Sequence, residues 1–176
     1  NIFETLMTRD ENNNPITDLA ASYTLSPDGL TYTFKLREGV KFHNGKPMTS
    51  ADVLASFDRY NKLGLERGMF SNVASWDAPD AATFVIHMKV PQPTFIEAIS
   101  AFSVPIIIVP SEQADAAAMQ LDIIGTGPWQ LAKLVPGGYA ELKRYDGYTP
   151  NTKYEDRTGF GGYKQACFDT VTFRIV

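Results

Sequence analysis

Alternating hydrophobic and polar positions indicate where this chain forms strands. In residues 31–37 every second side chain is aromatic or aliphatic, and the residues between them are threonine, lysine or arginine. Strands are also predicted at 73–76 and at 83–88, the latter with a similar alternation. Because a strand of this kind is apolar on one face, the three segments predict a mixed or antiparallel sheet with one buried face.

The period changes after residue 49, and the new spacing predicts a helix. Thr49 or Ser50 can cap its first turn, which also holds Asp52, and the pattern continues to about Lys62. We expect this helix to cover the predicted sheet, so that Phe34 is buried against it. The apolar side chains of the helix share one face and are Val53, Leu54, Phe57 and Tyr60.

Turn-forming residues divide the rest of the chain into shorter elements. The run 10–15 predicts a tight reversal, and Asn44-Gly45 is a dipeptide favoured in two-residue hairpin turns. The stretch 146–162 is polar and glycine-rich. The other predicted elements are a short helix at 94–101, an apolar strand at 106–109, an alanine-rich helix at 111–119, antiparallel strands at 129–134 and 140–144, and a strand at 171–176.

The composition is that of a folded domain. Of the 176 residues, 44% are hydrophobic, 12% aromatic and 20% charged, which excludes the highly charged, low-aromatic class of chain that stays disordered. The formal net charge of −4 and the lack of a basic run argue against nucleic acid and anionic membranes as partners. No uncharged stretch approaches the roughly 20 apolar residues of a membrane span.

The residues that usually carry metal or catalytic chemistry are scattered. His43 and His87 lie far apart, and the single Cys167 permits neither an internal disulfide nor a cysteine-based zinc site. Gly125-Thr126-Gly127 lacks the third glycine of a dinucleotide fingerprint, and the acidic run 10–15 lacks the glycine that a calcium loop needs. We therefore expect no metal, no cofactor and no enzyme activity.

Four aromatic residues could contact a ligand: Phe70, Trp76, Phe102 and Trp129. Each of them could instead fill the core, which is the commoner role of a large aromatic side chain. The hydrophobic pattern alone does not separate the two roles.

Three stretches of the sequence together resemble one protein family. Residues 30–53, Leu-Thr-Tyr-Thr-Phe-Lys-Leu-Arg-Glu-Gly-Val-Lys-Phe-His-Asn-Gly-Lys-Pro-Met-Thr-Ser-Ala-Asp-Val, resemble the signature of family 5 extracellular solute-binding proteins. These are the dipeptide, oligopeptide and nickel receptors of bacterial ABC importers. Gly-Thr-Gly-Pro-Trp at 125–129 is similar to a second element of that family, and 169–176 resembles the strand that leads into its second large lobe.

The resemblance implies a mixed α/β (α+β) fold, namely part of the type II periplasmic-binding-protein fold. Residues 1–124 would form the small extra domain of such a receptor, and residues 125–176 would form part of its first large lobe. Chains of the family are much longer, so we expect this one to be a fragment with something removed before Asn1. The opposite lobe, which supplies much of the ligand cleft, would be missing. The strands of 129–176 would then be left partly uncovered.

The resemblance also implies a function. The protein would be the substrate-binding component of an ABC importer, capturing a peptide or another small organic solute and delivering it to the membrane permease. It would act in the periplasm or outside the cell, with a lipid anchor as one option. We expect a monomer, with self-association through uncovered edges as the alternative. A sensory or regulatory protein that uses the same fold is the other class of function.

Four candidate ligand-binding residues follow from the resemblance. Receptors of the family tend to present an aromatic residue from the loop after the long helix, and Phe70, beside Met69, occupies that position here. The second segment contains Phe102 and Ser103. The nickel receptors have a basic residue near the position of Ser103, so the neutral hydroxyl favours a peptide or another organic solute over a metal chelate. We expect Phe70 to be exposed.

Overall fold

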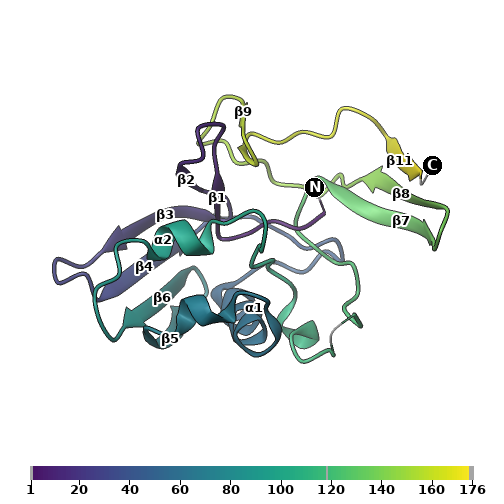
Figure 1. The fold of residues 1–176 in the computed structure, drawn as a ribbon. Coiled ribbons are helices and arrows are strands. Elements are labelled where there is room, and N and C mark those ends of the chain that lie inside the picture. The colour runs from purple at the N-terminus through teal and green to yellow at the C-terminus, as the bar shows by residue number, and fades with distance from the viewer. Residues whose placement is uncertain (1, 118, 175–176) are drawn as a thin grey trace.

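The computed structural model describes residues 2–117 and 119–174, and its largest element is a four-stranded antiparallel sheet (Figure 1). The strands run in the order β3-β4-β6-β5. All three strands predicted for this sheet are confirmed. The elements are β3 (Ala20–Leu25), β4 (Thr31–Leu36), β5 (Val73–Asp80) and β6 (Thr83–Met88).

Strand β3 was not predicted, although Ala21, Tyr23 and Leu25 alternate with Ser22 and Thr24 in the sequence. Ala20 is buried, but the five residues that follow it are exposed, and the strand lies at the edge of the sheet. Strand β4 lies inside the sheet, and its Phe34 is paired with Phe84 of β6. Alternation in the sequence therefore indicates a strand, but it does not show by itself that the apolar side is buried.

Helix α1 (Ser50–Leu63) covers this sheet, as expected. It begins with a capping box, in which the Asp52 carboxylate accepts a hydrogen bond of 2.8 Å from the Thr49 backbone N–H. Phe34 and Phe57 are both fully buried, and the Phe57 ring centroid lies 4.9 Å from that of Phe84. Burial of a large aromatic side chain stabilises a fold by about 1.5–3 kcal/mol, so these rings are a main source of its stability.

Two predictions in the middle of the chain are wrong. Residues 106–109 form no strand, because only Ile107 makes a β-bridge, to Thr5, although Ile106, Ile108 and Val109 are buried. The alanine-rich helix is reduced to the 3₁₀ turn η2 (Ser111–Gln113) among residues 111–117, and residue 118 lies outside the described residues.

The physical reason for the missing helix lies in α1. The guanidinium of Arg59 donates hydrogen bonds to the carbonyl oxygens of Ala114 and Ala116, which a helix would use for its own backbone bonds. The segment is thus held in an irregular form by a side chain from another element. The predicted helix at 94–101 is present as the shorter α2 (Phe95–Ile99).

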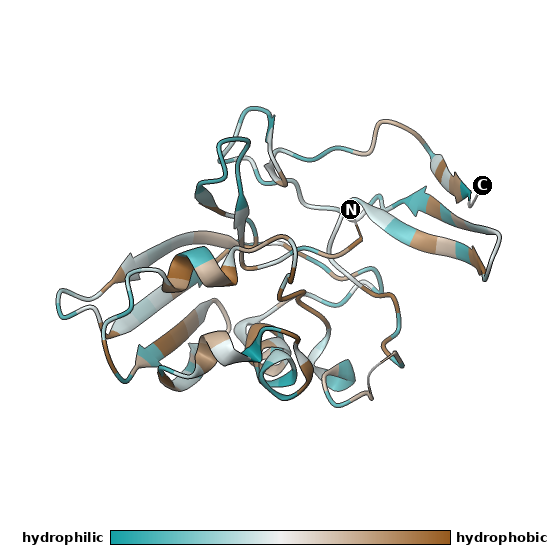
Figure 2. Ribbon diagram, viewed as in Figure 1, coloured by the Kyte–Doolittle hydropathy of each residue, from teal (hydrophilic) through white to brown (hydrophobic). Residues whose placement is uncertain are grey.

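A second, three-stranded antiparallel sheet lies apart from the first, at the upper right of Figure 1. Its strands are β7 (Trp129–Val135), β8 (Tyr139–Arg144) and β11 (Thr170–Arg174), in the order β11-β8-β7. These confirm the three predicted strands, apart from positions 175–176, which lie outside the described residues. Figure 2 shows hydrophobic positions on β7 and β11 as well as on the strands of the first sheet.

Two small hairpins lie side by side above the four-stranded sheet in Figure 1. The predicted reversal joins β1 (Met7–Arg9) to β2 (Pro15–Thr17). The second hairpin, β9 (Arg157–Thr158) with β10 (Gly161–Gly162), lies within the polar glycine-rich stretch, where no element was predicted. A 3₁₀ turn, η1 (Arg67–Phe70), follows α1. Within the described residues, no helix is long and apolar enough to cross a membrane.

Candidate ligand-binding site

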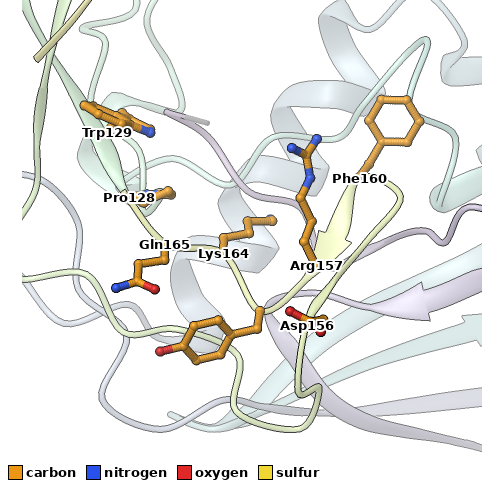
Figure 3. A pocket seen from close by; sticks show the side chains of 8 residues that line it. Pro128, Trp129, Asp156, Arg157, Phe160, Lys164 and Gln165 are labelled. Atoms are coloured by element: carbon orange, nitrogen blue, oxygen red, sulfur yellow. The ribbon is translucent and has the colours of Figure 1, made fainter. Parts of the chain in front are cut away.

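A cavity of about 470 Å³ lies beside the β9–β10 hairpin (Figure 3). Its wall combines aromatic, acidic and basic side chains, which is typical of a site that binds a small polar molecule. In Figure 3 Arg157 points from the hairpin into the space between Trp129 and Phe160. The lining residues are Pro128, Trp129, Asp156, Arg157, Phe160, Tyr163, Lys164 and Gln165.

A second, smaller cavity of about 160 Å³ shares Phe160 and Lys164 with the first. It brings together residues from the N-terminal segment, the loop after α2 and the hairpin. Its lining residues are Phe3, Glu4, Thr5, Thr8, Asp18, Ser100, Ala101, Phe102, Pro105, Phe160 and Lys164. The two cavities together form the candidate site.

Two aromatic rings stack at the border of these cavities. Phe102, from the loop after α2, and Phe160, from the turn of the β9–β10 hairpin, have centroids 4.4 Å apart and planes inclined by 15°. Each residue is 53% exposed. Large apolar groups left this exposed on a folded protein often mark a surface that contacts another molecule.

The hairpin that carries Phe160 is fixed against the β1–β2 hairpin. The Phe160 N–H donates a hydrogen bond of 2.9 Å to the Arg9 carbonyl, and the Thr158 hydroxyl donates one to the Glu11 carboxylate. Gly159 has a φ of +53°, and a Cβ there would lie 2.4 Å from the backbone carbon of Asp10. Glycine is therefore required where the two hairpins meet.

The wall of the smaller cavity includes a buried network of charges. The Lys164 ammonium donates hydrogen bonds to Asp18 at 2.9 Å and to Glu4 at 3.3 Å, and both carboxylates are almost completely buried. The Thr126 hydroxyl also donates to Glu4, at 2.9 Å. The Arg37 guanidinium lies 4.0 Å from the same carboxylate. These contacts join segments from both ends of the chain.

Burial and charge shift the pKa values of this network in ways that follow from its geometry. Burial raises the pKa of Glu4, the Asp18 carboxylate raises it further, and the cations of Lys164 and Arg37 only partly offset this. Burial alone would lower the pKa of Lys164, but Asp18 and Glu4 outweigh it, so that pKa is raised. Burial and the nearby Glu4 carboxylate also raise the pKa of Tyr148, whose hydroxyl donates to Glu4. Lys164 therefore stays charged, and it is already paired.

His43 holds residues 125–127, which directly precede Pro128 and Trp129 of the larger cavity. Its Nδ1 accepts a hydrogen bond of 3.3 Å from the Gly125 N–H, and its Nε2 donates to the Gly127 carbonyl at 3.0 Å, which fixes the neutral ring. Burial lowers the pKa of His43. A Cβ on Gly125 would lie 2.1 Å from the Ile2 carbonyl oxygen, so glycine is required here because the N-terminal segment passes close to it.

The predicted exposure of Phe70 is wrong. Phe70 is only 5% exposed, and its ring centroid lies 5.1 Å from that of Trp76 and 5.7 Å from that of Phe57. The 3₁₀ turn η1 folds this residue back into the core, where α1 and β5 enclose it. Met69 is partly buried against the same core. Neither residue lines the two cavities described above.

Phe102 and Ser103 are both exposed, and Phe102 lines the smaller cavity. Sequence reasoning did not identify Arg157, Phe160 or Lys164 as site residues. The one available signal was the glycine-rich stretch around them, because glycines at that density mark tight turns. Within the described residues no group of three or more His, Cys, Asp or Glu side chains could hold a metal ion.

Comparison with known proteins identifies the family. The family description "Bacterial extracellular solute-binding proteins, family 5 Middle" matches residues 14–176. A Brucella ovis protein named for ABC-transporter peptide binding is 38% identical over 149 residues, which cover 80% of this chain. The glutathione-binding protein GsiB of Escherichia coli is 35% identical over 133 residues, which cover 74% of this chain. The chain spans 28% and 26% of these two relatives.

Solved structures agree with this match. NikA of Brucella suis, in complex with Fe(III)-EDTA, superposes with a TM-score of 0.80 at 25% identity, over 99% of this chain and 33% of that one. AgaA from A. tumefaciens, in complex with agropinic acid, has a TM-score of 0.77 at 27% identity, over 98% of this chain and 33% of that one. The fold is thus part of a type II periplasmic-binding-protein fold. The chain belongs to the family 5 extracellular solute-binding proteins of bacteria.

Proposed function

We propose that this protein is the substrate-binding component of an ABC importer, which captures a peptide or another small organic solute and passes it to a membrane permease. The observation that carries the proposal is the family match combined with a cavity of about 470 Å³ lined by aromatic and charged side chains. A volume of this size suits a short peptide or a compact organic acid. The protein would capture its solute without chemical change, so it would not be an enzyme.

The ligands named for relatives support this class of solute. Glutathione and agropinic acid are small polar molecules that carry carboxylates. A receptor for such solutes would work in the periplasm or outside the cell, with or without a lipid anchor. Ligand contacts made by a second lobe would favour a closed state over an open one.

The proposed domain boundary separates the two sheets of the chain. Residues 1–124 would form the small extra domain and residues 125–176 part of the first large lobe. The candidate site contains residues from both parts, since Phe102 meets Phe160 and Glu4 meets Lys164. Phe102 and Ser103 remain proposed ligand contacts, and Arg157 and Phe160 are added to them.

The test is equilibrium binding by the full-length protein, followed by uptake in cells. Isothermal titration calorimetry against a library of di- to pentapeptides, glutathione and small organic acids should identify a solute with a Kd in the micromolar range or tighter. Deletion of the gene should then abolish uptake of that solute. A protein that binds a solute without affecting its uptake would instead support a sensory or regulatory role.

A further inference from the structure

The β9–β10 hairpin places one positive charge in the larger cavity without a paired carboxylate. Among the described residues, Arg9, Arg37 and Arg144 each lie within 4.0 Å of a carboxylate, and Lys164 is paired with two. Arg157 makes no such pair within the same part of the chain. Its described hydrogen bond runs from Nε to the Gly159 carbonyl of its own hairpin, at 3.3 Å.

That hydrogen bond determines which N–H groups of the guanidinium are left to bind a ligand. With Nε engaged in the hairpin, the two Nη groups remain at the far end of the side chain, which points into the cavity in Figure 3. Two parallel N–H donors match the two oxygens of a carboxylate, and a charge-assisted pair of this kind is among the stronger hydrogen-bonded contacts in proteins. The arrangement is suited to an anion that arrives from solution.

The aromatic residues beside Arg157 define the other half of the site. The Phe160 ring stacks on the Phe102 ring, and both residues remain about half exposed. Trp129 forms the opposite side of the cavity in Figure 3, with the Arg157 side chain between them. A flat or apolar group that covered these rings would remove their surface from water and gain the usual hydrophobic free energy.

Asp156 adds a negative charge at the same cavity, and it is exposed. It disfavours ligands with several negative charges, and it can accept hydrogen bonds from an amino group. The combined chemistry is that of a monocarboxylate or a zwitterion with an apolar side chain.

We propose that the β9–β10 hairpin selects the ligand, with Arg157 binding a carboxylate and Phe160 packing on an adjacent apolar or aromatic group. This inference rests on the proposed function, and it narrows the solute to a carboxylate-bearing molecule such as a peptide with a free, apolar C-terminal residue. Arg157 and Phe160 are then specificity-determining residues of the receptor.

The test compares free acids with their amides in the full-length protein. The probes are hippurate and tripeptides that end in Phe or Ala, each as the free acid and as the amide. The wild-type protein should prefer the acid by about tenfold or more, since removing a charge-assisted partner has an effect of this size. Arg157→Gln should reduce that preference to within about twofold, and Arg157→Lys should keep part of it. Phe160→Ala should instead reduce the preference for Phe over Ala while leaving the acid preference in place.

Lys143→Gln is the matched control, because it removes one positive charge from the exposed side of β8, away from the cavity. It should leave both preferences unchanged. An acid preference that persists in Arg157→Gln overturns the proposal, as does a preference lost equally in Lys143→Gln. Binding of uncharged solutes alone overturns the carboxylate assignment and leaves solute capture intact. Binding of no solute at all overturns both proposals.

Discussion

The two main sheets of the protein have similar strand patterns but differ in what covers them. In the four-stranded sheet, Phe34, Phe84 and Ile86 are fully buried, and α1 lies over them. In the three-stranded sheet, Leu134 is 55% exposed and Phe173 is 56% exposed. An apolar hollow of about 510 Å³ runs along this second sheet, and its lining includes Leu131, Leu134 and Phe173.

The difference shows how far the alternation of a strand predicts its burial. Alternation determines which face of a strand is apolar, but another element must supply the surface that covers that face. In the first sheet that element, α1, follows within the described residues. In the second sheet the described residues supply only part of the cover, from the N-terminal segment and the segment at 105–107.

The largest expected effect tests this comparison with one aromatic residue from each sheet. Phe34→Ala should destabilise the chain by about 3–5 kcal/mol, because it leaves a cavity in a fully packed core. Phe173→Ala, its matched control, should cost less than about 1 kcal/mol, because the ring is already 56% exposed. Urea unfolding measures both. Equal losses would show that the second sheet is covered after all.

The next effect concerns the buried charges that join the two regions. Lys164→Met should cost about 3 kcal/mol at neutral pH, because Glu4 and Asp18 would lose a buried ammonium that lies within 3.3 Å of both. Lys143→Met, on the exposed side of β8, should have little effect. Urea unfolding at neutral pH measures both variants, and an equal cost for the two would show that the buried pairs do not hold the regions together.

The stability of the Lys164→Met variant should also depend on pH. A carboxyl group whose folded pKa is raised contributes stability below its ordinary pKa and loses it as the pH rises through the folded value. Because the folded pKa of Glu4 is already raised, Lys164→Met should regain stability as the pH falls toward 4.5, the ordinary glutamate value. Unfolding curves between pH 4.5 and 7 check this, and a variant that loses stability throughout that range would contradict it.

Amide hydrogen exchange should be slower in the four-stranded sheet than in the three-stranded sheet. Amides of β4 and β6 should exchange only through global unfolding, because both strands have neighbours on each side and lie under α1. Amides of β7, an edge strand of the other sheet, should exchange faster. Uniform protection in a chain shown to be monomeric would contradict this comparison.

A smaller effect concerns His43 and the turn at 125–127. Burial lowers the folded pKa of His43 below 6.5, so the unfolded chain binds the proton more readily. Stability should therefore be complete above pH 6.5 and should decrease as the pH falls below it, by about 1 kcal/mol or less. His43→Gln should flatten this part of the curve in thermal unfolding measured between pH 5 and 7.5. An unchanged slope would mean that the ring is not neutral in the folded protein.

The smallest expected change in stability is at Leu134, on the uncovered sheet. Leu134→Lys should alter the free energy of unfolding by less than about 0.5 kcal/mol, because the side chain is already 55% exposed. It should, however, reduce any self-association of the 176-residue chain, which analytical ultracentrifugation measures. Self-association that persists in the variant would place the contact elsewhere.

The sequence by itself determined the local features of this protein. The face of β4 that is buried and the start of α1 at its capping box both follow from residues close together in the chain. The same stretches carry the resemblance to the solute-binding family, which the comparisons confirm. Such features depend on backbone geometry and short-range spacing, so they are readable before the fold is known.

Only the tertiary structure decided which residues form the candidate site and which fill the core. Phe70 was the leading ligand-contact candidate from the sequence, yet it packs against Phe57 and Trp76, whereas Phe102 stacks on Phe160 at a cavity. Likewise, the alanine-rich pattern predicted a helix, but Arg59 binds a carbonyl oxygen of that segment and the helix does not form. These outcomes arise from contacts between residues far apart in the chain. Burial and charge pairing depend on which distant segments the fold brings together, and no local pattern records that.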